Sequence, residues 1–405
     1  MARTSAWRSA VPALLAGLLA AGCRETTVAP GDCPTLCPSA EVDVLDTTLT
    51  GIVASDSSYR GFVSAPEAAI NRLSNLPGDL SAAVVQFFPR PDHWFGTSLV
   101  DTIRLASVDS VTLTVRVAQR DTSVDSLRIL VYRAPRPRTI DTLTTYDSVA
   151  AWIHDSLLVD SIPIPDSLQA GAITWRLPDG AFTPDTVDSN IVGAVFVLRS
   201  PTPTVVNITA NDFIGEPQLA WYGRAADTTL TNLFTSVPSF DTFVQSPEPP
   251  AMLADRLFVG NIPAARALLR FTIPRYFIDS TTIVRALLVL SPMAPAGGIP
   301  STDFLLEARG IVRDYGAKSF FTPDGSLISG VRVTVGDTAQ VEIGITNILR
   351  TWRGIPPDSL PRAVILRVAD EGRTLGELAF APSSGGARAP FLRLTYIKPY
   401  VFGVP

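Results

Sequence analysis

The sequence contains few of the residues on which common active sites depend. Among its 405 residues there are 3 cysteines and 2 histidines, His93 and His154. No Gly-x-Ser-x-Gly, His-Glu-x-x-His or phosphate-binding loop motif occurs in the chain. Nucleophilic, zinc-dependent and nucleotide-dependent enzymes rely on such motifs. We therefore expect no catalytic residue, no bound metal and no cofactor.

Positive charge is also scarce. Lysine occurs only at Lys318 and Lys398, the formal net charge is −5, and no basic stripe is present. An acidic surface is repelled by phosphate backbones, so nucleic acid is not an expected partner. Charged residues make up 18% of the chain and hydrophobic residues 46%, which favours a packed core over disorder. The length suits two domains.

Carboxylates are abundant, but their sequence context is that of turns. Asp370-Glu371-Gly372 has the composition of a tight turn between strands. No spacing resembles that of an EF-hand, and whether a structural calcium binds stays open. An enzyme that degrades polysaccharides with a carboxylate pair is the least favoured hypothesis. Most of the other aspartates precede serine or threonine, as at Asp109, Asp125, Asp147, Asp155, Asp160, Asp166 and Asp279.

The first 22 residues are predicted to be a cleavable signal peptide. Arg3 and Arg8 supply positive charge ahead of the apolar stretch Ala10–Ala21. This stretch is too short to span a bilayer comfortably, so a permanent transmembrane helix is disfavoured. The alternative that stays open is a different cleavage site nearby, as in ordinary secretion.

The end of the apolar stretch, Leu19-Ala20-Ala21-Gly22-Cys23, resembles the lipobox of bacterial lipoproteins, although Ala20 stands where leucine is preferred. The resemblance implies that Cys23 is diacylated and anchors a tether, residues 23–43, in a membrane. Arg24 replaces the aspartate that is linked in some bacteria to retention in the inner membrane. We therefore expect an exported lipoprotein of the outer membrane that faces the periplasm or the cell surface.

The remaining cysteines, Cys33 and Cys37, lie within this tether. Export exposes them to an oxidising compartment, where a local disulfide is favoured. A metal site is the alternative, but no histidine or further cysteine stands nearby to complete one.

The body is predicted to be an internal duplication, with one repeat at residues 44–224 and the other at residues 225–400. Asp46–Thr50 reappears unchanged as Asp227–Thr231. A gapless continuation of this match places Phe62-Val63 opposite Phe243-Val244.

The later strands of the two repeats keep the same order. Val108–Val115 aligns with Ile283–Leu290, and both segments alternate between apolar and polar residues. Trp175 falls opposite Ile343, and both repeats end in a similar strand that contains Trp221 in the first repeat. Trp175 and Trp221 are therefore predicted to lie in the core.

Many short apolar runs separated by turns predict an all-β fold, with two tandem antiparallel sandwiches of jelly-roll type. Pro178-Asp179-Gly180 and Pro323-Asp324-Gly325 mark two of the turns. Two helical stretches are expected. Asp147–Leu158 spaces apolar residues at helical intervals, and Thr346–Trp352 is a single turn with Thr346 as its cap and Trp352 as a packing anchor.

The second repeat resembles the DNRLRE-type β-sandwich domains of exported bacterial proteins, which are related to carbohydrate-binding modules. The resemblance covers about 140 residues and extends weakly to the first repeat, which lacks a counterpart of Trp352-Arg353-Gly354. It implies a jelly-roll sandwich with a binding or architectural role, and it identifies no ligand. The residues that carry it are Ala267–Phe271, Ile283–Leu290, Ile345–Gly354, Ala363–Glu371 and Pro390–Tyr396.

An aromatic pair recurs at one place in both repeats. His93, Trp94 and Phe95 follow a proline-rich turn, and Tyr276 and Phe277 follow Pro-Arg in the second repeat. Such side chains can stack on sugar rings, so these five are candidate ligand-binding residues. Core filling beneath a loop is the ordinary explanation of a shared aromatic pair.

These observations favour a non-catalytic, lipid-anchored envelope protein with a binding or architectural role. Its expected partners are the membrane and, in addition, a glycan or another envelope protein, with glycan as the favoured ligand class. A purely structural or protein-binding module without a small-molecule site is the first alternative. Exposed aromatic residues in a groove would favour glycan binding, whereas an extensive contact between the repeats would favour the structural alternative.

Overall fold

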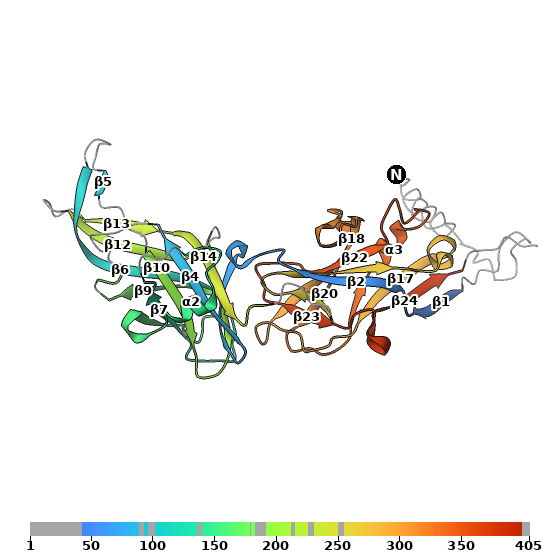
Figure 1. Ribbon diagram of the computed structural model, residues 1–405, viewed down its shortest axis with the longest axis horizontal. Helices are drawn as coiled ribbons and strands as arrows, with labels where there is room; N and C mark the ends of the chain where they lie inside the picture. The colour runs from blue at the N-terminus through green and yellow to red at the C-terminus, as the bar shows by residue number, and fades with distance from the viewer. Residues whose placement is uncertain are drawn as a thin grey trace, which may run out of the picture. The chain divides into compact units, whose positions relative to one another are not determined.

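The computed structural model describes residues 43–88, 93–95, 102–135, 140–178, 180–182, 192–211, 215–225, 231–249 and 255–398. Two compact units are distinguished, Met1–Asp43 and Val44–Pro405, and the second holds every element described below. The described secondary structure is dominated by antiparallel strands and contains only short helical turns (Figure 1). The prediction of an all-β sandwich fold is confirmed.

Val44–Pro405 contains two groups of strands, which we call lobe 1 and lobe 2. Lobe 2 has a four-stranded sheet, β1-β24-β17-β21, and a second sheet in which β20, β18, β22, β16 and β2 are neighbours. Its strands are β1 (Val44–Leu49), β2 (Val53–Arg60), β15 (Leu257–Gly260), β16 (Ala265–Phe271), β17 (Thr282–Leu290), β18 (Asp303–Arg313), β19 (Phe320–Phe321), β20 (Ile328–Thr334), β21 (Val341–Gly344), β22 (Ala363–Val368), β23 (Glu377–Phe380) and β24 (Phe391–Ile397).

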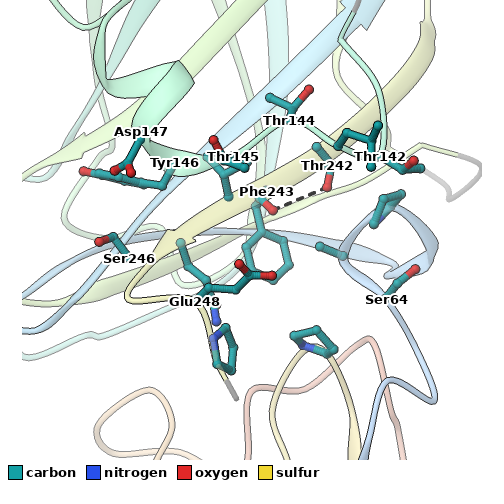
Figure 2. Close-up of a pocket in the computed structure, with 17 residues that line it drawn as sticks. Ser64, Thr142, Thr144, Thr145, Tyr146, Asp147, Thr242, Phe243, Ser246 and Glu248 are labelled. Carbon is teal, nitrogen blue, oxygen red and sulfur yellow. Dashed lines mark hydrogen bonds between the residues drawn. The ribbon is translucent and has the colours of Figure 1, made fainter. Parts of the chain in front are cut away.

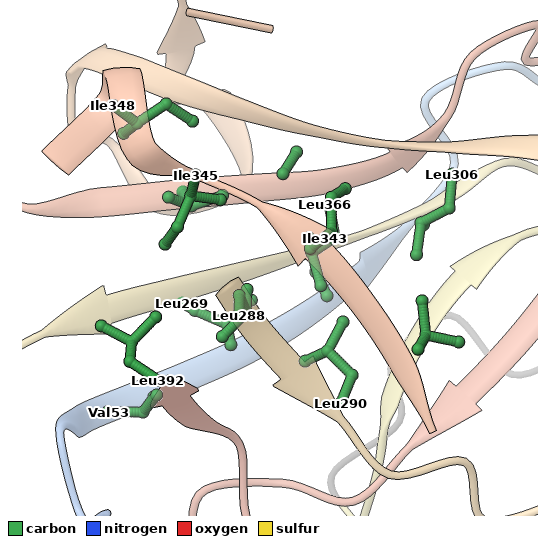
Figure 3. Close-up of a cluster of buried hydrophobic side chains, with 14 of the residues drawn as sticks. Val53, Leu269, Leu288, Leu290, Leu306, Ile343, Ile345, Ile348, Leu366 and Leu392 are labelled. Atoms are coloured by element: carbon green, nitrogen blue, oxygen red, sulfur yellow. The ribbon is translucent and has the colours of Figure 1, made fainter. Parts of the chain in front are cut away.

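The two sheets of lobe 2 enclose one hydrophobic core. Leu288 and Leu392 enter it from the four-stranded sheet, and Leu269 and Leu366 enter it from the other sheet. Figure 3 shows Val53, from the N-terminal strand β2, among these residues of the C-terminal half. Alternation of apolar and polar residues along each strand places one face of each sheet in this core, as in a β-sandwich.

Lobe 1 is built around β6, a strand of 19 residues. β6 pairs with β9 and β12 along its middle and with β11 at its end, while β4 pairs with β10, β14 and β3. Its strands are β3 (Ile70–Leu76), β4 (Asp79–Phe87), β5 (His93–Phe95), β6 (Thr102–Arg120), β7 (Arg128–Arg133), β8 (Leu158–Pro163), β9 (Gly171–Leu177), β10 (Val192–Arg199), β11 (Val205–Thr209), β12 (Gln218–Ala225), β13 (Thr231–Ser236) and β14 (Pro238–Ser246).

The main core of lobe 1 lies between these strands. Leu113 of β6 and Trp221 of β12 meet Val85 of β4 and Phe196 of β10 within it. Trp221 is fully buried, as predicted. Trp175 is only half-buried, and its indole N–H donates to Asp160 at 2.9 Å.

The first two strands of the described chain belong to lobe 2, not to lobe 1. β1 pairs along its whole length with β24, and β2 pairs with β16. Conversely, β13 pairs with β12 and β14 with β4, so these two strands belong to lobe 1. In Figure 1 the blue strand β2 lies beside the orange and red strands of the C-terminal half. We call this arrangement the strand exchange. It differs from the contiguous repeats predicted at residues 44–224 and 225–400.

Strand registers in the two lobes are nevertheless equivalent. Leu219 pairs with Leu113 in lobe 1, and Leu392 pairs with Leu288 in lobe 2, with a bulge a few residues further along each pair. Trp175 pairs with Leu113 as Ile343 pairs with Leu288, which agrees with the predicted alignment of these strands.

The equivalence extends to the exchanged strands, but with a different alignment from the predicted one. Asp56 lies opposite Leu269, and Asp241 lies opposite Val85. Val84–Phe87 in the first repeat aligns with Leu268–Phe271 in the second, so Val85 and Leu269 are equivalent positions. The register also shifts at equivalent positions, next to Phe87 in the β14–β4 pair and next to Phe271 in the β2–β16 pair. Asp56 and Asp241 are therefore counterparts, and the gapless match of Phe62 to Phe243 is wrong. The internal duplication itself stays a prediction.

Both predicted helices are shorter or differently capped than expected. The region predicted as the first helix instead contains the short helix α2 (Tyr146–Ala150) and the 3-10 turn η2 (Asp155–Leu157). Trp152 is buried between them. The second is α3 (Thr346–Thr351), whose N-cap is Ile345. The Thr346 hydroxyl instead accepts a hydrogen bond from the backbone N–H of Ala286, so its predicted role as cap is wrong. Trp352 is buried against the ring of Phe271, as expected of an anchor.

The remaining helical turns connect strands and each covers less than two turns of helix. They are η1 (Ala65–Glu67), η3 (Tyr276–Ser280), η4 (Gly316–Lys318), η5 (Gly325–Leu327) and η6 (Gly386–Arg388). Asp324 caps η5, and Gly372 has a left-handed backbone (φ 78°) in the turn that begins at Asp370. The turns predicted at Pro323–Gly325 and Asp370–Gly372 are confirmed.

A small apolar cluster joins the two lobes. Ile70 and Phe243 of lobe 1 pack in it with Ile262, Ile299 and Leu375 of lobe 2. Its members are buried to the same degree as the main cores. Lobe 2 thus contains two strands from the N-terminal side of lobe 1, and the two lobes share this apolar cluster.

Candidate functional site

The structure separates the two predicted aromatic pairs. His93, Trp94 and Phe95 form β5, which pairs with β6, but their side chains lie outside the described residues. Cys23, Cys33 and Cys37 also lie outside the described residues. The predicted lipid attachment, the disulfide and the first aromatic pair therefore stay predictions.

Tyr276 and Phe277 form the start of η3 and have different environments. Phe277 packs against the core of lobe 2, and its ring makes edge-to-face contacts with Tyr276 and Tyr396, each at 5.3 Å between centroids. The Thr281 hydroxyl closes the turn by donating to the carbonyl of Phe277 at 2.7 Å. Tyr276 is 44% exposed. Phe277 is thus a packing residue, whereas Tyr276 is partly open to solvent.

A cleft of about 560 Å3, which we call the threonine cleft, lies in the described part of the chain. It lies between the segment before η1, the turn before α2 and the end of β14 (Figure 2). Its volume is within the range of small-molecule sites. The lining residues are Ser64, Ala65, Pro66, Thr142, Leu143, Thr144, Thr145, Tyr146, Asp147, Thr242, Phe243, Val244, Gln245, Ser246, Glu248, Pro249 and Pro263.

Local hydrogen bonds hold the rim of the threonine cleft. Thr145 caps α2 by accepting from the backbone N–H of Ser148, and Asp141 accepts from the N–H of Leu143 at 2.9 Å. On the opposite side, the Ser64 hydroxyl donates to Glu67 at 2.8 Å in a capping box. Threonine, serine and aspartate favour such turns because their side chains bond to nearby backbone groups.

The threonine cleft is rich in hydrogen-bond acceptors and has no cationic lining residue. Asp147 and Glu248 supply carboxylates, and the side-chain oxygen of Gln245 is buried without a protein donor. An anionic ligand would be repelled here, whereas a ligand with several hydroxyl donors would satisfy these oxygens. Of its two aromatic lining residues, Phe243 is buried, and Tyr146, which Figure 2 shows beside Asp147, is partly buried.

A second hollow, of about 570 Å3, lies on the outer face of the four-stranded sheet of lobe 2. Three of its four charged side chains, Asp46, Glu342 and Arg393, have hydrogen-bond partners, and the fourth is Arg285. Arg393 bonds to Glu342 at 2.5 Å, and the Thr395 hydroxyl donates to Asp46 at 2.6 Å. No aromatic side chain lines it. This face therefore resembles a solvated sheet surface more than a ligand site.

A buried ionic cluster lies where lobe 1 meets lobe 2. Glu377 accepts a hydrogen bond from the side chain of Asn261, with Arg60 and the Arg72–Asp79 ion pair nearby. Burial raises the pKa of Glu377, and the positive charge of Arg60 opposes this effect. Burial likewise lowers the pKa of Arg60. The cluster brings charged residues from both halves of the sequence together and was not predicted.

A larger charged network covers the outer face of the second sheet of lobe 2. Arg266 forms a bidentate pair with Glu371 at 2.8 and 2.6 Å, and Arg309 pairs with Glu307 at 2.8 Å. The ring of Phe321 lies over these guanidinium groups, 4.8 Å from Arg309. Glu371 is thus an ion-pair partner as well as a turn residue. Every carboxylate named here has a cationic partner, which is typical of structural networks.

His154 is exposed. The Nδ1 atom of His154 lies 2.8 Å from the hydroxyl of Ser156, two residues further along the chain, at the start of η2. Among the described residues, no group of three or more potential metal ligands is found. In the same part of the chain, no helix is long and apolar enough to cross a membrane.

No protein-family model, curated protein or solved structure matches the chain. The resemblances to the lipobox and to the DNRLRE-type domains therefore stay predictions, and the proposals below depend on the contacts within this chain.

Proposed function

We propose that this chain is a non-catalytic, lipid-anchored protein of the bacterial cell envelope with an architectural role. The observation that carries the proposal is the strand exchange, because lobe 2 combines β1 and β2, from the N-terminal side of lobe 1, with strands from the C-terminal side of lobe 1. An extensive connection between the repeats is the feature expected of a structural module rather than of two independent binding domains.

The attachment point of the tether supports this role. The tether ends at β1, whose six residues pair continuously with β24 from Val44–Ile397 to Leu49–Leu392. Leu49 and Ile52 add apolar contacts with the core of lobe 2. A pull on a lipid-anchored tether would therefore act first on a fully paired strand, not on a flexible loop.

The contacts between the lobes support it further. The backbone N–H of Ala69 donates to the carbonyl of Gly372 at 2.8 Å, beside the apolar cluster that contains Ile70 and Leu375. The ionic cluster of Glu377 adds charged groups from both lobes. These contacts resist independent motion of the lobes, as a spacer or scaffold requires.

Glycan binding at the threonine cleft is the second candidate function. Its hydroxyl- and carboxylate-lined surface can accept hydrogen bonds from sugar hydroxyl groups, and the ring of Tyr146 provides apolar surface. Tyr276, by contrast, does not line this cleft. We therefore propose the cleft, together with the predicted site at Trp94, as the places where a glycan would bind.

An array of glycans and polysaccharides, probed with the soluble body (residues 44–405), distinguishes the two candidates. The architectural proposal expects no saturable binding by the wild-type body. Binding that is lost in Asp147→Asn but kept in Asp324→Asn would establish the cleft as a glycan site, because Asp324 also stands at a short helical turn but lies outside the cleft. Loss in Trp94→Ala alone would place the site at the first aromatic pair.

The architectural role is tested in the source bacterium. Deletion of the protein is expected to increase the sensitivity of the cells to detergent, and full-length chain is expected to restore resistance. A chain that lacks residues 44–60, and with them β1 and β2, should not restore it. Unchanged detergent resistance after deletion would contradict an architectural role.

A further inference from the structure

One end of lobe 2 is formed by the start of β1, the end of β24 and the start of β17. Val44 of β1 lies opposite Ile397 of β24, which in turn lies opposite Thr282 of β17. We call this the tether end, because the predicted tether, residues 23–43, joins the body at Val44. In Figure 1 the labels of β1, β24, β17 and α3 lie together here.

Two short helical elements complete the tether end. η3 directly precedes β17, and the ring of Phe277 in η3 contacts the ring of Tyr396, which pairs with Leu45 of β1. The backbone N–H of Gly354, just after α3, donates to the carboxylate of Asp279 in η3 at 3.1 Å. These contacts hold η3 and the end of α3 beside the point at which the chain enters lobe 2.

The tether end presents apolar side chains to solvent. Tyr276 in η3 is 44% exposed, and Ile355, which follows Gly354, is 38% exposed. Exposed apolar side chains that gather at one place, rather than being scattered singly, indicate a surface that meets a partner. The exposed set at this end is Val44, Tyr276, Val284 and Ile355.

The charge of the tether end differs from that of the chain as a whole. Its cations outnumber its carboxylates, whereas the chain has a formal net charge of −5. Arg275, Arg353 and Lys398 are exposed and have no ion-pair partner among the described residues. Such cations can contact phosphate groups without first losing a carboxylate partner. The cations are Arg275, Arg350, Arg353 and Lys398, and the carboxylates are Asp43, Asp279 and Asp358.

We propose that the tether end docks on the surface of a lipid bilayer that contains anionic headgroups. Its apolar side chains enter the headgroup region, while its arginine and lysine side chains contact lipid phosphates. The inference rests on the proposed lipid anchor, because residues 23–43 span at most about 70 Å and so keep the start of β1 near the bilayer. Such a tether raises the local concentration of the tether end at the lipid to about the millimolar range, so a weak contact is sufficient.

A fluorescent reporter beside Tyr276 tests the docking. Residues 23–405 are prepared with the three cysteines replaced by serine and with an N-terminal histidine tag. The protein is attached to vesicles of phosphatidylethanolamine, phosphatidylglycerol and a nickel-chelating lipid. An environment-sensitive fluorophore on Ser280→Cys, in η3, is expected to brighten severalfold on attachment and to be quenched by a lipid-borne quencher. Because the tag replaces the acyl chains, this result is independent of acylation, which palmitate labelling of the full-length chain tests separately.

The matched reporter is Ser301→Cys. Ser301 is also an exposed serine in a turn of lobe 2, but it stands two residues after Ile299, which packs in the apolar cluster between the lobes. Its fluorophore should remain unquenched. Equal quenching at the two positions would indicate non-specific adsorption and overturn the proposal. A Ser280 reporter that stays unquenched, or that is already shielded by protein before vesicles are added, would overturn it as well.

Two double variants distinguish the tether end from exposed aromatic residues in general. Tyr276→Ser with Ile355→Ser should abolish most of the quenching of the Ser280 reporter. Tyr315→Ser with Phe320→Ser should leave the quenching unchanged, because these two rings are more exposed but adjoin β18 and β19 of the other sheet. Equal loss of quenching in both double variants would contradict docking through the tether end.

Hydrogen exchange of the tagged protein without a reporter keeps the proposal testable if a variant misfolds. Attachment to the vesicles is expected to slow exchange at residues 275–284 and 353–355 and to leave residues 315–321 unchanged. Unchanged exchange at the first two segments would refute the docking.

Discussion

Asp56 of β2 and Asp241 of β14 each bind a neighbouring segment of their own lobe through the side-chain carboxylate. Each carboxylate accepts a hydrogen bond from a backbone N–H in the segment that follows a strand of its lobe, Ser383 after β23 and Asn211 after β11. Aspartate is otherwise uncommon inside strands, because its side chain competes for backbone hydrogen bonds. Here the two carboxylates bond to the backbone at Ser383 and Asn211 and so hold these segments against their strands.

The first prediction is that Asp241→Ala destabilises the protein by about 1–3 kcal/mol. Asp241 is buried, and its loss removes an acceptor from the Asn71 side chain and from the Asn211 N–H. The free energy of unfolding in urea measures the effect. Asp337→Ala is the control, because Asp337 makes a similar bond to a backbone N–H, at 2.8 Å, in an exposed turn. Equal losses in the two variants would contradict the importance of burial.

The second prediction concerns pH. Burial raises the pKa of Glu377 above the ordinary value of 4.5, so the folded protein binds this proton more tightly than the unfolded chain does. Glu377 therefore contributes stability that is complete below pH 4.5 and is lost as the pH rises through the folded pKa. Relative to Glu377→Gln, wild-type protein should gain stability as the pH falls towards 4.5, measured by unfolding in urea.

Asp314→Asn is the control for this titration, and the opposite sign is expected. The bond from Arg270, 2.9 Å at its second oxygen, lowers the pKa of Asp314 below 3.8. Its contribution is present above pH 3.8 and is lost as the pH falls through the folded pKa, so wild-type protein loses stability relative to Asp314→Asn on acidification. The same slope in both comparisons would refute these assignments.

Several residue environments were predictable from the sequence, and others were not. Trp221 and Trp352 were expected to be buried because each stands in an apolar pattern, and both are. Glu371 was expected only as a turn residue, because its partner Arg266 is far away in the sequence. Arg266 and Arg270 alternate with the core residues Ala267 and Leu269 and so indicate charge on the outer face of β16, but a face does not identify an ion-pair partner.

At the scale of the element, strands were predictable but their partners were not. A period of two assigns a residue to one face of a strand and carries no information about the neighbouring strand. The repeated Asp46–Thr50 sequence therefore suggested two contiguous repeats, whereas the backbone pairs β1 with β24. The first helix was overestimated because Trp152 and Ile153 have helical spacing but lie between α2 and η2, whereas the second, a single turn, was predicted to within one residue.

The third prediction tests whether the N-terminal strands stabilise the C-terminal lobe. Ile52, in the turn between β1 and β2, is 3% exposed and belongs to the core of lobe 2. Ile52→Ala should cost about 2–4 kcal/mol through lost burial and the resulting cavity. Hydrogen exchange is expected to accelerate in β16 and β24, more than 200 residues away in the sequence. Acceleration confined to residues 44–60 would contradict the pairing.

The matched control for this variant is Ile140→Ala. Ile140 is equally buried, 4% exposed, but packs in lobe 1 against α2. Its loss should affect β4 and β10 first, since these strands contribute the neighbouring residues Val84 and Val195. If both variants accelerate exchange at the same strands, the two cores are not energetically distinct.

At the scale of the whole molecule, the strand exchange predicts coupled unfolding of the two lobes. Lobe 2 cannot lose β1 and β2 without disturbing the connection to Ile70 and the apolar cluster that joins the lobes. As the fourth prediction, calorimetry of residues 44–405 should give one transition, with equal calorimetric and van't Hoff enthalpies. Two resolved transitions would show that the lobes unfold independently.

The fifth prediction concerns the membrane anchor. When the full-length chain is expressed in a Gram-negative host and labelled with radioactive palmitate, the wild-type protein should take up label and sediment with membranes. Cys23→Ser should remove the label, because this residue would carry the acyl chains, whereas Cys33→Ser should retain it. Label in the Cys23→Ser variant would refute the lipobox assignment.

The strand exchange also orders events in time. An exported chain leaves its transport channel from the N-terminus, so β1 and β2 are the first strands to emerge. Their partner β16 follows some 200 residues later, and β24 arrives at the very end of the chain. Lobe 1 can close in the meantime, since all of its strands lie between these two points. For the export proposed above, this order leaves β1 and β2 unpaired until β16 and β24 have emerged.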